Sequence, residues 1–213
     1  MPPASPKPRK TLNIAGGSEN HLLGVVVPCF RETAHIMGVL ETIGQEAQRI
    51  YVIDDACPDG TGDLVEQQCT DPRVTVLRQD KNTGVGGATM TGYRQALADG
   101  CMVVVKLDGD GQMDGSLIPR LVAPIIDGSA DYTKGNRFHG FRGFSEMPRT
   151  RIFGNLVLSL ASKFSSGYWN VLDPTNGFTA IHRAALDKLP LDRMANGYFF
   201  ESDMLFHLGL ARA

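Results

Sequence analysis

The chain has 213 residues, of which 42% are hydrophobic, and carries 21 Lys and Arg against 23 Asp and Glu, for a net charge of −2. This balance excludes the basic surface typical of nucleic-acid-binding domains, so nucleic acid is not an expected partner. The four cysteines form no CxxC pair and no Cys/His cluster with zinc spacing, which indicates a reducing, cytoplasmic setting.

Residues 1–20 are predicted to form a flexible N-terminal tail. Met1 to Lys10 is rich in Pro, Lys and Arg and has no apolar run that would mark a signal peptide. No run in the chain approaches the roughly 18 apolar residues of a membrane span. We therefore expect a cytoplasmic protein, and a peripheral position on the cytoplasmic face of a membrane stays open because the tail is cationic.

Four strand–helix units are predicted along the first half of the chain. The strands are nearly continuous apolar runs, at Leu22–Val27, Arg49–Asp54, Val74–Leu77 and Cys101–Leu107. The helices have apolar residues at helical spacing, at about Glu32–Ile43, Thr61–Cys69, Ala88–Ala98 and Ser116–Ile126. This alternation predicts an α/β fold with a mostly parallel, Rossmann-like sheet flanked by helices on both faces.

The pattern changes after residue 129. We predict a strand over Asp131–Arg137, an amphipathic helix over Arg151–Phe164, a strand over Phe178–Ile181 and a last helix over Phe200–Leu210. One folded domain of residues 21–213 thus divides into a nucleotide-binding half, 21–128, and a smaller acceptor-side half, 129–213. Because the chain stops just after a helix with no closing strand, we expect a C-terminal truncation.

Ligands bind such sheets at the carboxyl ends of the strands. Each predicted strand ends in a candidate site, namely Pro28, Asp54-Asp55, Asn82–Gly87 and Asp108–Gln112. Asp108 and Asp110 lie in alternate positions with a glycine between them, so both can turn toward one hard cation such as Mg²⁺ or Mn²⁺, to which Gln112 can add an amide oxygen. The alternative is a solvated Asp-Gly turn.

Two further strand ends carry alternatives of their own. One of Asp54 and Asp55 is expected to contact a ribose or base, while Asp59 is expected to cap the following helix. The Asn82–Gly87 run precedes a helix whose N-terminus can attract an anion, or it is a plain glycine-rich turn.

The second half supplies cations and two more carboxylates. Arg137, Arg149 and Arg151 have the guanidinium fork that suits phosphate oxygens, although each one alone is better explained as a surface charge. Glu201 and Asp203, at the start of the last helix, are candidates for a general base or for charges at the helix end.

In this order the motifs resemble the family 2 glycosyltransferases of the GT-A fold, in the branch of dolichol-phosphate mannose synthases and polyprenyl-phosphate glycosyltransferases. The matching segments are Val25–Glu32, Ile53–Asp55, Pro58–Thr61, Asn82–Ala88, Asp108–Gln112, Gly135–Phe138, Asp173, Asn176–Phe178 and Gly197–Glu201. The first motif departs from the family's Pro-x-Tyr-Asn-Glu, because Phe30-Arg31 replaces Tyr-Asn, and Asn176 replaces the usual Ser or Thr.

The resemblance implies a role for each position. Pro28, Phe30, Glu32, Asp54, Asp55, Asn82, Gly84 and Asp108 would bind the nucleotide or face the donor. Asp110 and Gln112 would hold Mg²⁺ or Mn²⁺, and Arg137, Arg149 and Arg151 would bind the acceptor phosphate. Asp108, Asp110, Arg137 and Asp203 form the expected catalytic set.

The implied activity is an inverting transfer of a sugar from a UDP- or GDP-sugar to a polyprenyl (dolichyl-type) phosphate. Two alternatives stay open: a family 2 enzyme with a saccharide hydroxyl acceptor, and a nucleotide-sugar binding module without turnover. A phosphate acceptor is largely ionised at neutral pH and needs no general base, whereas a hydroxyl acceptor needs one. The sequence does not predict an oligomeric state.

Overall fold

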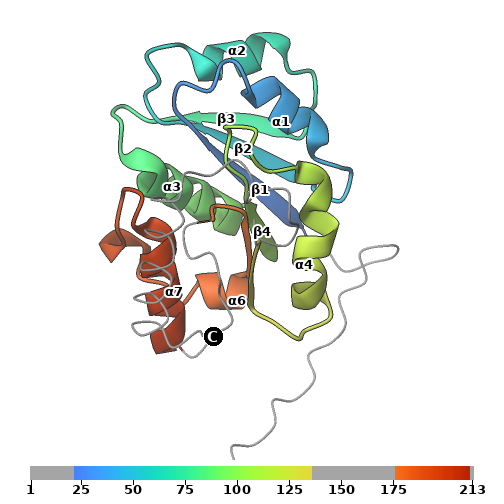
Figure 1. The fold of residues 1–213 in the computed structure, drawn as a ribbon, viewed down its shortest axis with the longest axis vertical. Helices are drawn as coiled ribbons and strands as arrows, with labels where there is room; N and C mark the ends of the chain where they lie inside the picture. Colours follow the sequence, from blue (N-terminus) through green and yellow to red (C-terminus); the bar gives the residue numbers. More distant parts are fainter. Residues whose placement is uncertain (1–21, 136–175, 212–213) are drawn as a thin grey trace, which may run out of the picture.

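A six-stranded mixed sheet forms the centre of the fold (Figure 1), in a computed structural model that describes residues 22–135 and 176–211. The strands are β1 (Leu23–Cys29), β2 (Arg49–Asp54), β3 (Val74–Arg78), β4 (Val103–Lys106), β5 (Tyr132–Lys134) and β6 (Thr179–His182), in the order β3-β2-β1-β4-β6-β5. The first four are parallel, as predicted. Strand β6 lies antiparallel between β4 and β5.

The helices follow the strands in chain order. They are α1 (Ile36–Thr42), α2 (Thr61–Gln68), α3 (Gly84–Ala98), α4 (Ile118–Ile126), α6 (Arg183–Leu186) and α7 (Phe200–Ala211), with single 3₁₀ turns η1 (Gly115–Leu117) and η3 (Leu191–Arg193). The sequence did not predict α6 or η3. The predicted helix over 151–164 lies outside the described residues, as do residues 1–20 and the end of the predicted strand over 131–137.

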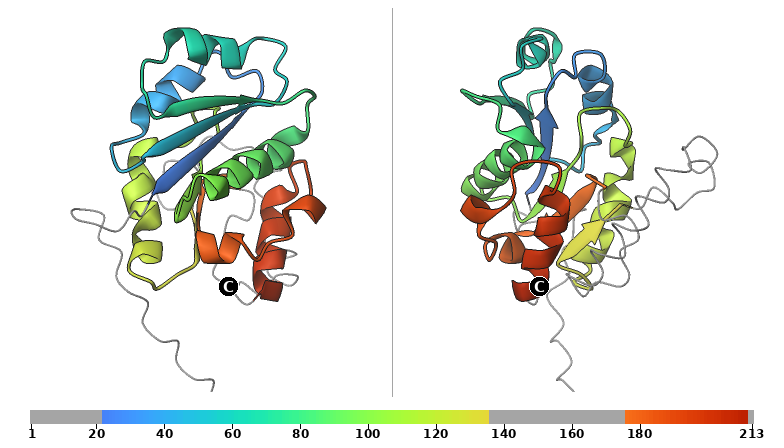
Figure 2. Two further views of the ribbon diagram at one scale, coloured as in Figure 1. Left: turned by 180° about the vertical axis from the view of Figure 1, so that it is seen from behind. Right: turned by 60° about the vertical axis from the view of Figure 1, so that its left-hand side comes forward.

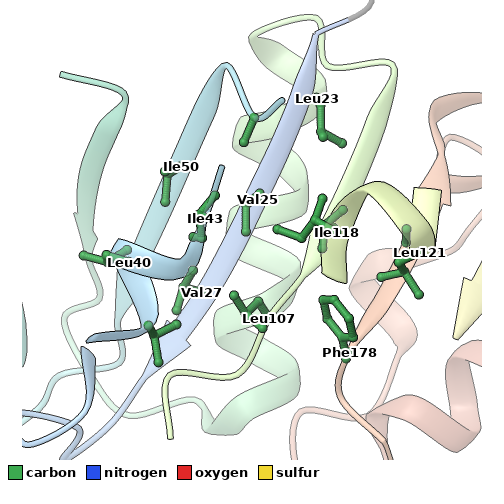
Figure 3. Close-up of a cluster of buried hydrophobic side chains, with 14 of the residues drawn as sticks. Leu23, Val25, Val27, Leu40, Ile43, Ile50, Leu107, Ile118, Leu121 and Phe178 are labelled. Carbon is green, nitrogen blue, oxygen red and sulfur yellow. The ribbon is translucent and has the colours of Figure 1, made fainter. Parts of the chain in front are cut away.

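Helices cover both faces of the sheet, as predicted, because successive side chains of a strand point to opposite faces. On one face, Val25 and Val27 of β1 pack with residues of α1 and α4 (Figure 3). On the other face, Val26 of β1 packs with residues of α3, α6 and α7. The right-hand view of Figure 2 shows α3 on one side of β1 and α1 and α4 on the other.

Two element boundaries differ from the prediction for local reasons. Strand β1 continues through Pro28 because the missing amide N–H points to the β4 side, where β4 has already ended at Lys106. Helix α1 begins at Ile36, four residues later than predicted, because Arg31 adopts a left-handed conformation (φ 64°) and the Glu32 carbonyl accepts hydrogen bonds from the amides of His35 and Ile36 in a turn.

Among the residues that the structure describes, no helix combines the length and the apolar character that crossing a membrane requires.

Candidate functional site

The segments that follow β1 and β4 lie against each other at the carboxyl edge of the sheet, as predicted. A Cβ on Gly109 would lie 2.9 Å from the Cys29 sulfur, 3.3 Å from the Pro28 carbonyl oxygen and 3.6 Å from Cγ of Glu32. The close approach depends on glycine at position 109. It brings the Asp108–Gln112 turn to the same place as Pro28 and Glu32.

Asp110 and Gln112 belong to a tight turn after β4. Oδ1 of Asp110 accepts a hydrogen bond from the Gln112 amide at 3.0 Å, and Gly111 between them has φ 73°. Asp110 is half-buried and Gln112 is exposed. Within 22–135 and 176–211, no group of three or more His, Cys, Asp or Glu side chains could hold a metal. Carboxylate and amide oxygens are the ligands that hard cations such as Mg²⁺ and Mn²⁺ prefer, so Asp110 and Gln112 have donor atoms of the kind that such a cation would need.

Lys106 joins Asp108 to helix α7, an arrangement that the sequence analysis missed. Its side chain is 1% exposed, and its ammonium nitrogen lies 2.6 Å from Oδ1 of Asp108 and 2.7 Å from Oε1 of Glu201. The sequence does contain a signal for this pairing, which is a lysine within the otherwise apolar run before Asp108. Lysine is almost never fully buried unless it is paired with an acidic group. Burial lowers the pKa of Lys106, but the attraction of the two carboxylates outweighs it, and the pKa lies above its usual range.

Gly177 completes the surroundings of Asp108. A Cβ at this position would collide with the carboxylate of Asp108 and with the ammonium nitrogen of Lys106. The segment is held by buried Asn176, whose amide donates to the Gly135 carbonyl at 2.8 Å and whose Oδ1 accepts from the Phe178 amide at 2.9 Å. Asn176 therefore fixes Gly177 beside Asp108.

Asp54 and Asp55 are both buried, and their carboxylates bind backbone amides. Asp54 accepts hydrogen bonds from the amides of Cys57 (2.7 Å) and Gly62 (3.0 Å), the second of which lies in the first turn of α2. The prediction that Asp59 caps α2 is therefore wrong. The N-cap residue is Gly60, which has a left-handed backbone and provides no side-chain cap. The Asp59 carboxylate instead lies 3.8 Å from the Arg31 guanidinium.

Asp55 holds the start of α3 in the same way. Its Oδ1 accepts from the Thr83 amide at 2.7 Å and its Oδ2 accepts from the Gly84 amide at 2.8 Å. The two predicted nucleotide contacts thus lie at the expected edge, and in this structure their oxygens hold the loops of that edge in place.

The glycine-rich run at the start of α3 makes room for the chain's own backbone. The amides of Gly86 and Gly87 donate to the Asn196 carbonyl at 2.7 and 3.1 Å, and a Cβ on Gly84 would lie 2.6 Å from the same oxygen. Asn82 is exposed, and its Oδ1 accepts from the Gly84 amide at 3.1 Å. Of the two alternatives for this run, the structure favours the glycine-rich turn over an anion site, because Asp55 and the Asn196 carbonyl already accept from these amides.

Phe30 and Glu32 are accessible at the end of β1. Phe30 is 40% exposed, and the Arg31 guanidinium lies 5.5 Å from the centroid of its ring. Oε2 of Glu32 lies 3.3 Å from Nδ1 of His35. These side chains can meet a ligand without breaking a backbone contact.

The two carboxylates of α7 have separate partners. Glu201 is buried against Lys106, whereas Oδ2 of Asp203 accepts from the Ala195 amide at 2.8 Å and its Oδ1 lies 3.6 Å from His207. Asp203 therefore holds the segment that covers the start of α3. The predicted acceptor residues Arg137, Arg149 and Arg151 lie outside the described residues.

The chain matches the profile described as glycosyl transferase family 2 over residues 24–190, and it belongs to that family. It is 29% identical over 191 residues to UDP-N-acetylglucosamine–dolichyl-phosphate N-acetylglucosaminyltransferase of Methanococcus voltae, and this alignment covers 83% of the chain and 76% of the relative. It is 32% identical over 186 residues to undecaprenyl-phosphate mannosyltransferase of Micrococcus luteus, and this alignment covers 85% of the chain and 75% of that relative.

Solved structures share the fold. Glucosyl-3-phosphoglycerate synthase from Mycobacterium tuberculosis, in complex with Mn²⁺, UDP-glucose and phosphoglyceric acid, aligns with a TM-score of 0.66 and 21% identity over 87% of this chain. The chain spans 64% of the length of that structure. The predicted GT-A fold is confirmed, together with the resemblance to family 2.

Proposed function

We propose that this chain is a metal-dependent, inverting glycosyltransferase that moves a sugar from a UDP- or GDP-sugar to a polyprenyl phosphate. The observation that carries the proposal is the meeting of the Asp108–Gln112 turn with Pro28 and Glu32 at the carboxyl edge of the sheet. The names of the relatives in Methanococcus voltae and Micrococcus luteus support the lipid-phosphate acceptor. The solved complex with Mn²⁺ and UDP-glucose supports the donor class and the metal.

The proposed donor site divides its tasks among neighbouring residues. Phe30, Glu32 and Asn82 are accessible and meet the nucleotide, while Asp54 and Asp55 hold the loops that carry them. Asp108 faces the donor sugar, and Asp110 and Gln112 hold the cation. When bound, Mg²⁺ or Mn²⁺ supplies positive charge that stabilises the diphosphate leaving group.

The proposed acceptor is a phosphate because the described carboxylates of the second half are already engaged. Glu201 pairs with Lys106, and Asp203 accepts from the Ala195 amide. A phosphate monoester has a second pKa of about 6, so it attacks the anomeric carbon without a general base. Arg137, Arg149 and Arg151 are proposed to bind this phosphate through their guanidinium groups. Because the acceptor is a lipid, we expect peripheral association with the cytoplasmic face of a membrane.

A nucleotide panel tests the donor half of the proposal. Thermal unfolding of the chain is measured with UDP, GDP and their hexose and N-acetylhexosamine conjugates, each with and without MnCl₂, because a ligand that binds the native state raises the unfolding temperature. We expect one nucleotide series to stabilise the chain in the presence of Mn²⁺. No shift with any nucleotide would contradict the proposal.

Turnover with a short-chain polyprenyl phosphate tests the acceptor half. We expect the selected nucleotide sugar to yield a lipid-linked sugar and free nucleoside diphosphate. Transfer to a saccharide hydroxyl instead would assign the hydroxyl-acceptor alternative, and binding without turnover would assign the binding module.

A further inference from the structure

Lys106 is a buried cation at the junction of three elements near the proposed donor site. It is the last residue of β4, it pairs with Asp108 two positions later, and it pairs with Glu201 of α7, 95 positions away. Its side chain is 1% exposed and that of Glu201 is 8% exposed, while that of Asp108 is 30% exposed. The ion cluster is therefore closed on the side of the core and open at Asp108.

The remaining neighbours leave Asp108 little freedom. Gly177 lies so close that a Cβ would collide with Asp108 and Lys106. Tyr93 of α3 is fully buried nearby, and burial raises its pKa to about 12. Asp108 is thus held at Oδ1 by Lys106 and confined by Gly177.

Stability alone does not explain a buried ion cluster. Removing ions from water costs several kcal/mol per ion, so replacing a buried ion pair with apolar side chains of similar size is often neutral or stabilising. The ion cluster does fix the orientation of a carboxylate, and a carboxylate that contacts the sugar donor must hold its oxygen at one defined position. Two carboxylates without a cation between them would also repel each other and an incoming diphosphate.

We propose that Lys106 is a positioning residue of the donor site, which holds Asp108 in its donor-facing orientation and fastens α7 to the same point through Glu201. The inference rests on the proposed function, because it takes a nucleotide sugar as the ligand that Asp108 meets. Lys106 acts through Asp108 and does not itself contact the donor.

The test compares steady-state kinetics of the full chain and its Lys106→Met variant, which keeps a long side chain without the charge. The substrates are the UDP- or GDP-sugar that the wild type turns over and a short-chain polyprenyl phosphate. We expect the donor KM to rise about tenfold or more, the factor that corresponds to one lost hydrogen bond between charged groups. The acceptor KM should change by less than about twofold, because Asp108 meets the donor.

A double-mutant cycle separates positioning from a loss of folded protein. Adding Lys106→Met to Asp108→Asn should raise the donor KM little further, because the two substitutions remove the same contact. Hydrogen exchange of residues 107–112 should be faster in Lys106→Met than in the wild type. The matched control is Arg94→Met, which removes the exposed 2.6 Å ion pair with Asp192 and should keep the wild-type donor KM.

Three outcomes would overturn the inference: an unchanged donor KM in folded Lys106→Met, effects that add fully in the cycle, or unchanged exchange of residues 107–112. If Lys106→Met does not fold, Lys106→Gln, which keeps a hydrogen-bond donor, takes its place with the same expected direction. If the wild type turns over no nucleotide sugar, the proposed function fails by itself, and the exchange measurement still decides whether Lys106 holds Asp108.

Discussion

Position 177 requires glycine because the carboxylate of Asp108 and the ammonium group of Lys106 lie directly beside it. We expect Gly177→Ala to lower the free energy of unfolding by about 1–3 kcal/mol, since the added methyl group must displace Asp108 and Lys106, which are fixed by their own ion pair. Urea unfolding measures the change. Gly197→Ala is the matched control, because a Cβ at position 197 meets no atom within 4 Å. Equal stabilities of the two variants would contradict this account of the site.

Asp110 is the residue on which the proposed metal site depends. We expect Asp110→Asn to weaken Mn²⁺ binding and lower turnover by at least about tenfold, because a neutral amide replaces the carboxylate that the cation prefers. Titration calorimetry with MnCl₂ in the presence of the nucleotide measures the affinity. Asp127→Asn is the control, because Asp127 is an acidic turn residue that accepts a hydrogen bond from the Ser129 amide. Wild-type Mn²⁺ affinity in Asp110→Asn would exclude this carboxylate as a ligand.

At the scale of elements, the strands were well predicted because each is an apolar run ended by a polar residue or proline. The starts of helices were less predictable, since they depend on contacts from distant residues. Helix α3 begins at Gly84, four residues before the predicted start, because Asp55 binds the Gly84 amide and Asn196 binds the amides of Gly86 and Gly87.

The candidate site was also predictable only in part. The convergence of Pro28, Glu32 and the Asp108–Gln112 turn follows from parallel strands ending at one edge, so the sequence sufficed for it. The pairing of Lys106 with Glu201 did not follow, because it depends on where α7 packs. The antiparallel insertion of β6 between β4 and β5 was also not predictable from an apolar run of four residues.

Arg73 ties the loop after α1 to the start of β3, and this connection gives a pH-dependent prediction. Its guanidinium binds Asp71 at 2.6 Å and the carbonyls of Ile43 and Ala47 at 3.3 and 2.9 Å, and its hydrogen bonds hold the pKa of Asp71 below its usual range. A lowered pKa contributes stability above the unfolded value of about 3.9 and loses it as the pH falls through the folded value.

We therefore expect Asp71→Asn to cost about 1.5 kcal/mol of unfolding free energy at pH 7, and the difference from the wild type to shrink below about pH 4. Urea unfolding between pH 3 and 7 measures it. Asp192→Asn, which removes an ion pair on a 92% exposed side chain, should change stability by less than about 1 kcal/mol at any of these pH values. A pH-independent cost for Asp71→Asn would contradict the ion pair.

Helix α7 holds the segment over the start of α3 through Asp203. We expect Asp203→Ala to lower the unfolding free energy by about 1–2 kcal/mol and to speed hydrogen exchange at residues 84–87, because the Ala195 amide loses its acceptor. Turnover should fall less than in Asp110→Asn, since a phosphate acceptor needs no base. Complete loss of turnover in a folded Asp203→Ala protein would instead assign a hydroxyl acceptor.

On the scale of the whole molecule, the two predicted halves of the chain share one sheet. Strand β6 of the second half pairs with β4 of the first, and Phe200 and Met204 of α7 belong to the same buried cluster as Val26 of β1. The core of residues 21–128 is therefore completed in part by residues of the second half. A ligand that orders one half is expected to stabilise the other in the same unfolding transition.

The buried ammonium group of Lys106 also bears on synthesis of the chain by the ribosome. Strand β4 leaves the exit tunnel well before Glu201 has been translated, so during that interval Lys106 has Asp108 beside it and lacks the second anion that encloses it in the finished fold. The ammonium group of Lys106 therefore has to stay hydrated until α7 has been synthesised and packs against β4. We therefore expect closure of the α3 face of the sheet to wait for α7, so that this face stays partly uncovered in the nascent chain until residues 200–211 have been made.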